Sequence, residues 1–157
     1  MNGKDKLLLC HLRNNARTPL TILSRRTKIP VSTLYDRIKS NEKKNIIKKH
    51  TTLLNFDKIG FPIRAVLEFD VDHKEIKIFC EFISKHQNVN NAYRINNKYN
   101  YLIEGIFSSI RSADDFLTEV EQKFNVRSKE IHFIIDDITN EKFMTNENLF
   151  GLLYKAE

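Results

Sequence analysis

The sequence predicts an α+β protein made of two small domains, because its charge and its hydrophobic periodicity both change near residue 60. Residues 1–60 hold 14 Lys and Arg against 4 Asp and Glu, whereas the rest of the 157-residue chain holds 12 against 16. Apolar residues recur at helical spacing before this point, and alternate with polar residues directly after it. We therefore expect a cationic helical domain over residues 1–54, a linker over 55–61 and an α/β domain over 62–157.

Three short helices are expected in the first domain. The first carries a leucine stripe over residues 5–14. Thr18-Pro19 is a typical helix start, because threonine can cap a helix and proline is tolerated at its first position. Ile29-Pro30 ends this second helix, since proline disfavours helical geometry in the residue before it. A third helix follows to Lys43. The short turn between the last two helices is typical of a helix-turn-helix, the DNA-binding motif.

A small β-hairpin, or wing, is expected after the third helix. Ile46-Ile47 and the stretch from Thr51 to Leu54 are candidate strands on either side of Lys48-Lys49-His50. Asn45, just before them, tolerates a left-handed conformation at a helix end. Together these elements predict a winged helix-turn-helix.

The second domain has the periodicity of a ferredoxin-like sandwich. Residues 62–72 alternate strictly, with Ile63, Ala65, Leu67, Phe69 and Val71 on one side. A helix is expected over residues 76–83. Strands over 89–95 and 99–107 flank Asn96-Asn97-Lys98, a tight-turn signal because Asn tolerates positive φ. A capping box at residues 112–115 precedes a second helix, and a last strand includes Ile131, Phe133 and Ile135. The order is therefore βαββαβ.

In such a sandwich both helices cover the same face of an antiparallel sheet. The other face carries Val, Leu and Tyr residues, and the predicted elements leave no helix to cover it. A second copy of the chain is its simplest partner, so we expect a homodimer. The segment from Phe143 to Leu153 is apolar and is expected to pack back as a short helix or strand.

The sequence gives no sign of enzymatic chemistry. Cys10 and Cys80 have no partner at metal-ligand spacing, and we expect both to be buried thiols. The five histidines are scattered, and no Ser-His-Asp order or Gly-rich phosphate loop is present. We expect no catalytic residue, no metal site and no cofactor. Neither a signal peptide nor an apolar run of about 20 residues is visible, which indicates a soluble cytoplasmic protein.

Three stretches of the chain resemble a known family. They are Asn15-Ala16-Arg17, the run from Val31 to Ile38, and Thr51 to Asn55 leading into the linker. With the βαββαβ order, they resemble the leucine-responsive regulatory protein (Lrp/AsnC) family of bacterial and archaeal transcription regulators. The resemblance implies that the third helix enters the major groove of double-stranded DNA. It also implies that the α/β domain dimerises, that dimers assemble into tetramers or octamers, and that an amino-acid effector binds between dimers.

The residues expected to contact DNA lie on the last two helices and around them. Arg25, Arg26 and Lys28, with Lys43, Lys44, Lys48 and Lys49, are expected to bind phosphates, which sets affinity and not sequence choice. Base readers are expected on the exposed face of the third helix. Arg37 fits a structural, phosphate or base-reading role. Asp36 fits either a cytosine contact or an intrahelical contact with Lys39 or with the neighbourhood of Arg37. Besides Lys43 and Lys44, the residues expected to contact DNA are Arg17, Arg25, Arg26, Lys28, Ser32, Thr33, Tyr35, Asp36, Arg37, Lys39, Lys48 and Lys49.

The chain departs from the family pattern at a few positions. Lys28 and Asn45 replace glycines that are frequent in the family, and Asn41 replaces a leucine. In the hairpin of the second domain, the family commonly shows Gly-x-Tyr/Phe-Asp near the effector pocket. Here the loop contains Asn97, Lys98, Tyr99 and Asn100, which we take as the candidate effector residues.

Two other functions stay open from the sequence. Some proteins of the same architecture decarboxylate haem precursors, and these need His and Arg side chains that grip a tetrapyrrole. Alternatively, Tyr93, Tyr99 and Tyr101 lie on adjacent strands and could stack RNA bases. The net negative charge of the second domain speaks against a nucleic acid on that sheet.

Overall fold

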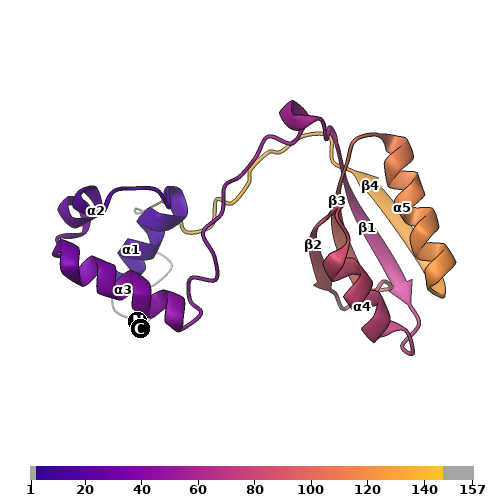
Figure 1. Ribbon diagram of the computed structural model, residues 1–157, viewed down its shortest axis with the longest axis horizontal. Helices are drawn as coiled ribbons and strands as arrows, with labels where there is room; N and C mark the ends of the chain where they lie inside the picture. The colour runs from indigo at the N-terminus through magenta and orange to yellow at the C-terminus, as the bar shows by residue number, and fades with distance from the viewer. Residues whose placement is uncertain (1–2, 147–157) are drawn as a thin grey trace. The chain divides into compact units, whose positions relative to one another are not determined.

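The structure is a computed structural model that describes residues 3–146 (Figure 1). The described chain forms two compact units. One contains the residues up to Leu53 together with those from Thr139 onward, and the other contains Leu54–Ile138. No helix in the described part is long and apolar enough to cross a membrane.

Three helices form the first unit, as expected. They are α1 (Gly3–Asn14), α2 (Leu20–Thr27) and α3 (Val31–Lys43). Their small core consists of Leu8, Leu23, Ile29 and Leu34. Each of these side chains is almost fully removed from water, so the leucine periodicity does identify the inner faces.

The turn between α2 and α3 is built on a left-handed residue. Lys28 has φ 56°, and its backbone N–H donates to the carbonyl of Ser24 at 2.9 Å. Thr27 closes the same helix end, because its hydroxyl donates to the carbonyl of Leu23 at 2.8 Å. Pro30 then stands at the N-cap of α3 and cannot continue α2.

The expected wing hairpin is not formed in the described residues. Asn45 is left-handed as expected, with φ 60°. The N–H groups of Ile46 and Ile47 then donate to the carbonyl of Asn41, and no strand is assigned from there to Leu54. Residues 48–50 contain no Gly, Asn or Asp, the residues that most favour a tight hairpin turn.

The second unit is a four-stranded antiparallel sheet with two helices. Its elements are β1 (Ile63–Val71), α4 (Ile76–Lys85), β2 (Val89–Arg94), β3 (Tyr101–Phe107), α5 (Ile110–Lys123) and β4 (Val126–Phe133). The strand order is β2-β3-β1-β4, which confirms the ferredoxin-like arrangement. A short 3-10 helix, η1 (Asp57–Ile59), lies before β1, and Gly60 with φ 91° ends it.

Both helices lie on the same side of the sheet (Figure 1). The core between them consists of the alternating residues of β1 and β3, among them Leu67, Phe69 and Ile103, with Phe79 from α4 and Phe116 from α5. We call the other side the open face. It carries the remaining residues of each strand, which the register places together: Arg64, Val66, Glu68 and Asp70 of β1, Leu102, Glu104 and Ile106 of β3, Tyr93 of β2, and Ser128, Glu130 and His132 of β4.

Several local expectations in the second unit were wrong in detail. The capping box is formed by Ser109 and Ser112, so α5 begins before the expected residue 112. The β2–β3 turn has no residue with positive φ and is wider than a two-residue turn, because the N–H of Ile95 donates to the carbonyl of Asn100. Ile135 is not in β4 and is almost fully exposed.

The cysteines also differ from each other. Cys10 is fully buried as expected, whereas Cys80 is exposed. The Cys80 thiol lies 3.6 Å from the Tyr101 hydroxyl and donates to it. Burial, together with this contact, raises the pKa of Tyr101 to about 12.

The chain returns to the first unit after β4. Arg13 of α1 forms a 2.6 Å ion pair with the carboxylate of Glu141, and its guanidinium also donates to the carbonyls of Glu141 and Phe143. Residues 139–146 therefore group with the three helices and not with the sheet domain, where the sequence had placed them. The apolar segment expected to pack back lies mostly outside the described residues.

Candidate nucleic-acid interface

One face of α3 is open to solvent. Leu34 is buried and Ile38 is half-buried, which fixes the inner side of the helix. Ser32, Tyr35 and Lys39 follow one another at helical spacing of three and four residues, and all three are exposed. Asp36 is exposed beside them, whereas Thr33 is half-buried. The structure thus brings the expected base readers together on one surface.

The Lys39 side chain contacts two other residues of α3, Tyr35 and Glu42. Its ammonium lies 5.9 Å from the centre of the Tyr35 ring and forms a 3.2 Å ion pair with Glu42. The hydrogen bond and the charge of Glu42 raise the pKa of Lys39. Glu42 also meets His50 at 3.1 Å, and the hydrogen bonds from His50 and Lys39 lower the pKa of this carboxyl.

This arrangement corrects the ion pair expected for Asp36. Lys39 pairs with Glu42, and Asp36 forms no ion pair within residues 3–146. The i,i+3 spacing of Lys39 and Glu42 was visible in the sequence and would have identified the pair. His50, the other partner of Glu42, was also missed.

Arg37 takes part in an ion pair within this unit. Its guanidinium forms a 2.5 Å ion pair with Asp5 of α1, and both side chains are largely buried. The pair ties the third helix to the first across 32 residues of sequence. This separation explains why Arg37 could not be distinguished from a DNA-contacting residue in the sequence.

The remaining cations near α2 and α3 are unpaired. Within residues 3–146, the expected phosphate-binding side chains are exposed and form no ion pair; they are Arg17, Arg25, Arg26, Lys28, Lys43, Lys44, Lys48 and Lys49. Arg25 and Arg26 lie in the last turn of α2, and Lys28 lies in the turn after it. A cluster of unpaired cations beside an exposed helix favours the binding of a polyanion such as DNA.

The candidate effector loop is partly occupied by structural contacts. The Asn100 side chain accepts from the N–H of Val71 and donates to its carbonyl, at 3.0 and 2.8 Å. Tyr99 is buried, and its hydroxyl donates to Glu130 at 3.1 Å. Lys98 lies over the Tyr99 ring at 5.0 Å. Asn97 and Lys98 are exposed, so they are the two of the four that face solvent.

The three tyrosines do not form a stacking surface. Tyr101 packs among the core residues at 5.0 Å from Phe79, and Tyr99 is buried. Only Tyr93 is largely exposed on the sheet. The sheet thus lacks the adjacent exposed rings that base stacking needs.

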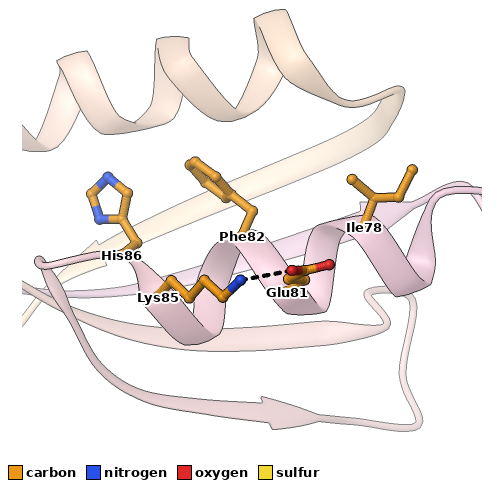
Figure 2. A pocket seen from close by; sticks show the side chains of 5 residues that line it. All are labelled: Ile78, Glu81, Phe82, Lys85 and His86. Atoms are coloured by element: carbon orange, nitrogen blue, oxygen red, sulfur yellow. Dashed lines mark hydrogen bonds and ion pairs between the residues drawn. The ribbon is translucent and has the colours of Figure 1, made fainter.

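A shallow hollow of about 380 Å³ lies along α4. Figure 2 shows Ile78, Phe82 and His86 along it, with the ion pair of Glu81 and Lys85 at its side. His86 is held in place, because its ring accepts from the N–H of Asn88 and meets Glu119 at 3.3 Å. The sequence analysis did not identify this feature.

Comparisons with known proteins decide the family. Residues 1–48 match the profile of a winged helix-turn-helix DNA-binding domain. Residues 64–142 match that of the Lrp/AsnC ligand binding domain. The chain belongs to the Lrp/AsnC family. It is a transcriptional regulator of this type, with a DNA-binding domain followed by a ligand-binding domain.

Individual relatives agree with this assignment. An uncharacterized HTH-type transcriptional regulator of Pyrococcus horikoshii is 24% identical over 91% of this chain and 96% of its own length. The HTH-type transcriptional regulator LrpC of Bacillus subtilis is 24% identical over 73% of this chain and 80% of its own.

Solved structures share the fold. A transcriptional regulator of Neisseria meningitidis, determined as a complex with L-Met, has a TM-score of 0.82 at 18% identity, covering 89% of this chain and 93% of its own. AsnC of E. coli has a TM-score of 0.80 at 17% identity, covering 92% and 98%.

Two departures from the Lrp/AsnC pattern have a backbone explanation. Lys28 and Asn45 replace frequent glycines, and both residues are left-handed. Glycine is the residue that adopts a left-handed conformation most easily, so both positions have the backbone for which glycine is suited. Asn tolerates this conformation well, whereas a lysine is strained in it.

Proposed function

We propose that the protein binds operator DNA as a two-fold dimer, with the exposed face of α3 in the major groove. The observation that carries this proposal is the set of unpaired cations beside that face. Arg25, Arg26 and Lys28 would contact phosphates on one side of the groove, and Lys48 and Lys49 those on the other. Arg17 completes the phosphate set.

Sequence choice is assigned to the exposed side chains of α3. Ser32 and Thr33 have hydroxyls that bond base edges or phosphates. Tyr35 and Lys39 support each other, so a change in one would alter the position of the other. Asp36 forms no ion pair within residues 3–146 and suits a cytosine amino group.

The open face of the sheet is proposed as the dimer surface. Both helices lie on the other side (Figure 1), while Val66, Leu102 and Ile106 lie on this one, with Tyr93 at β2. Half-buried aliphatic side chains in the middle of a sheet favour a matching sheet as partner. A two-fold dimer would present two copies of α3 to half-sites one helical turn apart.

An amino acid is proposed as the effector. The second unit matches a ligand-binding domain, and a structural neighbour was determined with L-Met. Lys98 and Asn97 are the exposed polar groups of the candidate loop and would meet the carboxylate of such a ligand.

The DNA-binding proposal is tested by the salt dependence of affinity. Operator fragments are first selected from random duplex DNA with the full chain. Fluorescence anisotropy then measures Kd against salt for the wild type and for Arg25→Gln/Arg26→Gln. Losing two phosphate contacts should reduce the slope of log K against log salt by about 2. Arg111→Gln, an exposed arginine of the sheet domain, is the matched control. An unchanged slope in the double variant would remove these residues from the interface.

The dimer is tested by sedimentation equilibrium. Val66→Asp should lower the mass toward that of one chain, because it places a charge in the centre of the proposed surface. Ile78→Asp, at an exposed position of α4, should leave the mass unchanged. A wild type that is monomeric at all concentrations would exclude this surface.

A further inference from the structure

Two basic side chains share one carboxylate near the end of α3. The Oε2 atom of Glu42 accepts from Nζ of Lys39 at 3.2 Å, and its Oε1 atom meets Nε2 of His50 at 3.1 Å. Lys39 and His50 therefore contact different oxygens of the same group. Because Lys39 is assigned to the surface that reads DNA, Glu42 competes with DNA for its ammonium.

The turn after α3 brings His50 to this carboxylate. Asn45 is left-handed, with φ 60°, and the N–H of Ile46 donates back to the carbonyl of Asn41 at 2.9 Å. The chain thus reverses direction at the end of the helix. As a result, a residue eight positions after Glu42 in the sequence meets its side chain.

His50 has few other neighbours that carry charge. It is exposed, and within residues 3–146 its ring forms no ion pair or hydrogen bond except the one with Glu42. The charged groups that face it from α3 are Glu42 and, across that carboxylate, Lys39. Its own segment adds Lys48 and Lys49, which are exposed and unpaired, and neither α1 nor α2 contributes a charged contact in this part of the chain.

Of the three groups, the imidazole is the one that ordinarily changes charge between pH 5 and 8. The hydrogen bonds from His50 and Lys39 lower the pKa of Glu42 below the ordinary 4.5, so this carboxylate stays ionised near neutral pH. The hydrogen bond and the charge of Glu42 raise the pKa of Lys39, so the ammonium stays protonated. The summed charge of the three groups is therefore zero while His50 is neutral, and becomes positive once His50 is protonated.

We propose that protonation of His50 releases Lys39 from Glu42 to DNA, so that the protein binds its operator more tightly in mild acid. While His50 is neutral, the charge of Glu42 acts on Lys39 alone. A protonated His50 shares that charge and repels Lys39, which weakens the attraction that keeps the ammonium on the helix. Glu42 is thus a positioning residue that acts on DNA through Lys39. The inference rests on the proposed binding of DNA by α3.

The test is the pH dependence of operator binding by the full chain, measured by fluorescence anisotropy at about pH 5.5 and about pH 8 in about 0.1 M salt. The wild type should bind up to about eightfold more tightly at the lower pH, because one more ionic contact steepens the slope of log K against log salt by about 0.9. His50→Gln should bind at both pH values as the wild type does at the higher one. Glu42→Gln should bind at the higher pH about as tightly as the wild type does at the lower one.

A double-mutant cycle separates release of Lys39 from a general effect of charge. Glu42→Gln should strengthen binding when Lys39 is present, and this gain should be largely lost in Glu42→Gln/Lys39→Gln. The dependence on pH should be lost in Lys39→Gln as well. If Glu42 only repelled DNA by its charge, the effects of the two substitutions would add.

Two variants of the sheet domain are the matched controls. His73→Gln removes an exposed histidine, and Glu81→Gln breaks the exposed pair of Glu81 with Lys85. Both should bind DNA with the affinity and pH dependence of the wild type. Lys39 and His50 are exposed and Glu42 is at the surface, so the three variants should fold, and melting curves check each of them.

The possible outcomes separate this inference from the function on which it rests. Duplex binding by the wild type that is equal at both pH values, pH dependence that persists in His50→Gln or in Lys39→Gln, or effects of Glu42→Gln and Lys39→Gln that add would each overturn the release of Lys39 alone. A wild type that binds no duplex DNA at either pH would overturn the proposed function together with this inference.

Discussion

The two units use their basic side chains in opposite ways. Around α2, Arg25, Arg26 and Lys28 have no acidic partner in the described residues. On the sheet, Arg64 joins Glu104 and Asp137, and Arg127 joins Asp70. Cations that stay unpaired are available to an external polyanion, whereas cations in partly buried pairs stabilise their own unit. We therefore expect the unpaired cations near α2 to contribute to DNA binding, and the paired cations of the sheet to contribute to the stability of its fold.

The largest expected effect is the loss of the Arg64 network. Arg64→Gln leaves Glu104 and Asp137 without their shared cation, and Arg64 and Glu104 are both mostly buried. We expect a loss of about 2 kcal/mol in the free energy of unfolding, measured by urea denaturation. The salt slope of DNA binding should not change. A changed slope would show that the sheet domain's cations also meet DNA.

Arg37 is an exception to this contrast, because it lies in the DNA-binding unit and yet forms an ion pair. Arg37→Gln should lower the free energy of unfolding by roughly 1–2 kcal/mol, through the loss of the Asp5 ion pair. The salt slope should stay as in the wild type. If the free energy of unfolding is unchanged and the slope of log K against log salt falls by about 1, Arg37 binds a DNA phosphate instead.

Replacing Lys28 with glycine is expected to raise the free energy of unfolding but to weaken the salt dependence of DNA binding. Lys28→Gly removes a side chain from a left-handed position and should stabilise the fold by roughly 0.5–1 kcal/mol. It also removes a proposed phosphate contact, so the salt slope should fall by about 1. Asn45→Gly is the matched control for the backbone effect alone. A Lys28→Gly protein with unaltered DNA binding would take Lys28 out of the interface.

The smallest expected effect is on acid stability. Burial acts to raise the pKa of Glu104, but hydrogen bonds from Asn91, Arg64 and Asn90 outweigh it and lower this pKa below the ordinary 4.5. A depressed pKa gives stability that is present above pH 4.5 and is lost as the pH falls through the folded value. The advantage of wild type over Glu104→Gln, less than about 1 kcal/mol, should therefore shrink below pH 4.5. An advantage that stays constant down to pH 3 would contradict this assignment.

The hydrophobic periodicity of the sequence was sufficient to predict the helices and strands, but it did not predict the residues at which they begin and end. The alternation of residues 63–71 gave both the strand and its inner face, because a sheet buries every second side chain. The capping box was misplaced because Ser112 and Asp115 fit the usual pattern of an acidic residue three positions after the cap, whereas Ser112 takes the place of that acidic residue in the box formed with Ser109. The two strands expected between residues 46 and 54 are not assigned, because strand-like composition alone does not form a hydrogen-bonded ladder.

Contacts between residues far apart in the chain could not be predicted from the sequence. Arg37 and Asp5 meet only when α1 packs on α3, and Glu68 faces Glu130 only in one register of β1 and β4. Sliding β4 along β1 by one residue would move Glu130 to the other face, while Glu68 would stay where it is. By contrast, the exposed surface of α3 followed directly from helical spacing around Leu34.

The return of the chain to Arg13 has a consequence for proteolysis. The polypeptide passes between the two units twice, before β1 and again after β4. Cleavage at the exposed residues near Gly60 would break the first passage and leave the three helices and the sheet in separate fragments. These fragments would then be joined only by non-covalent contacts, among them the exposed ion pair and hydrogen bonds of Arg13 with Glu141 and Phe143.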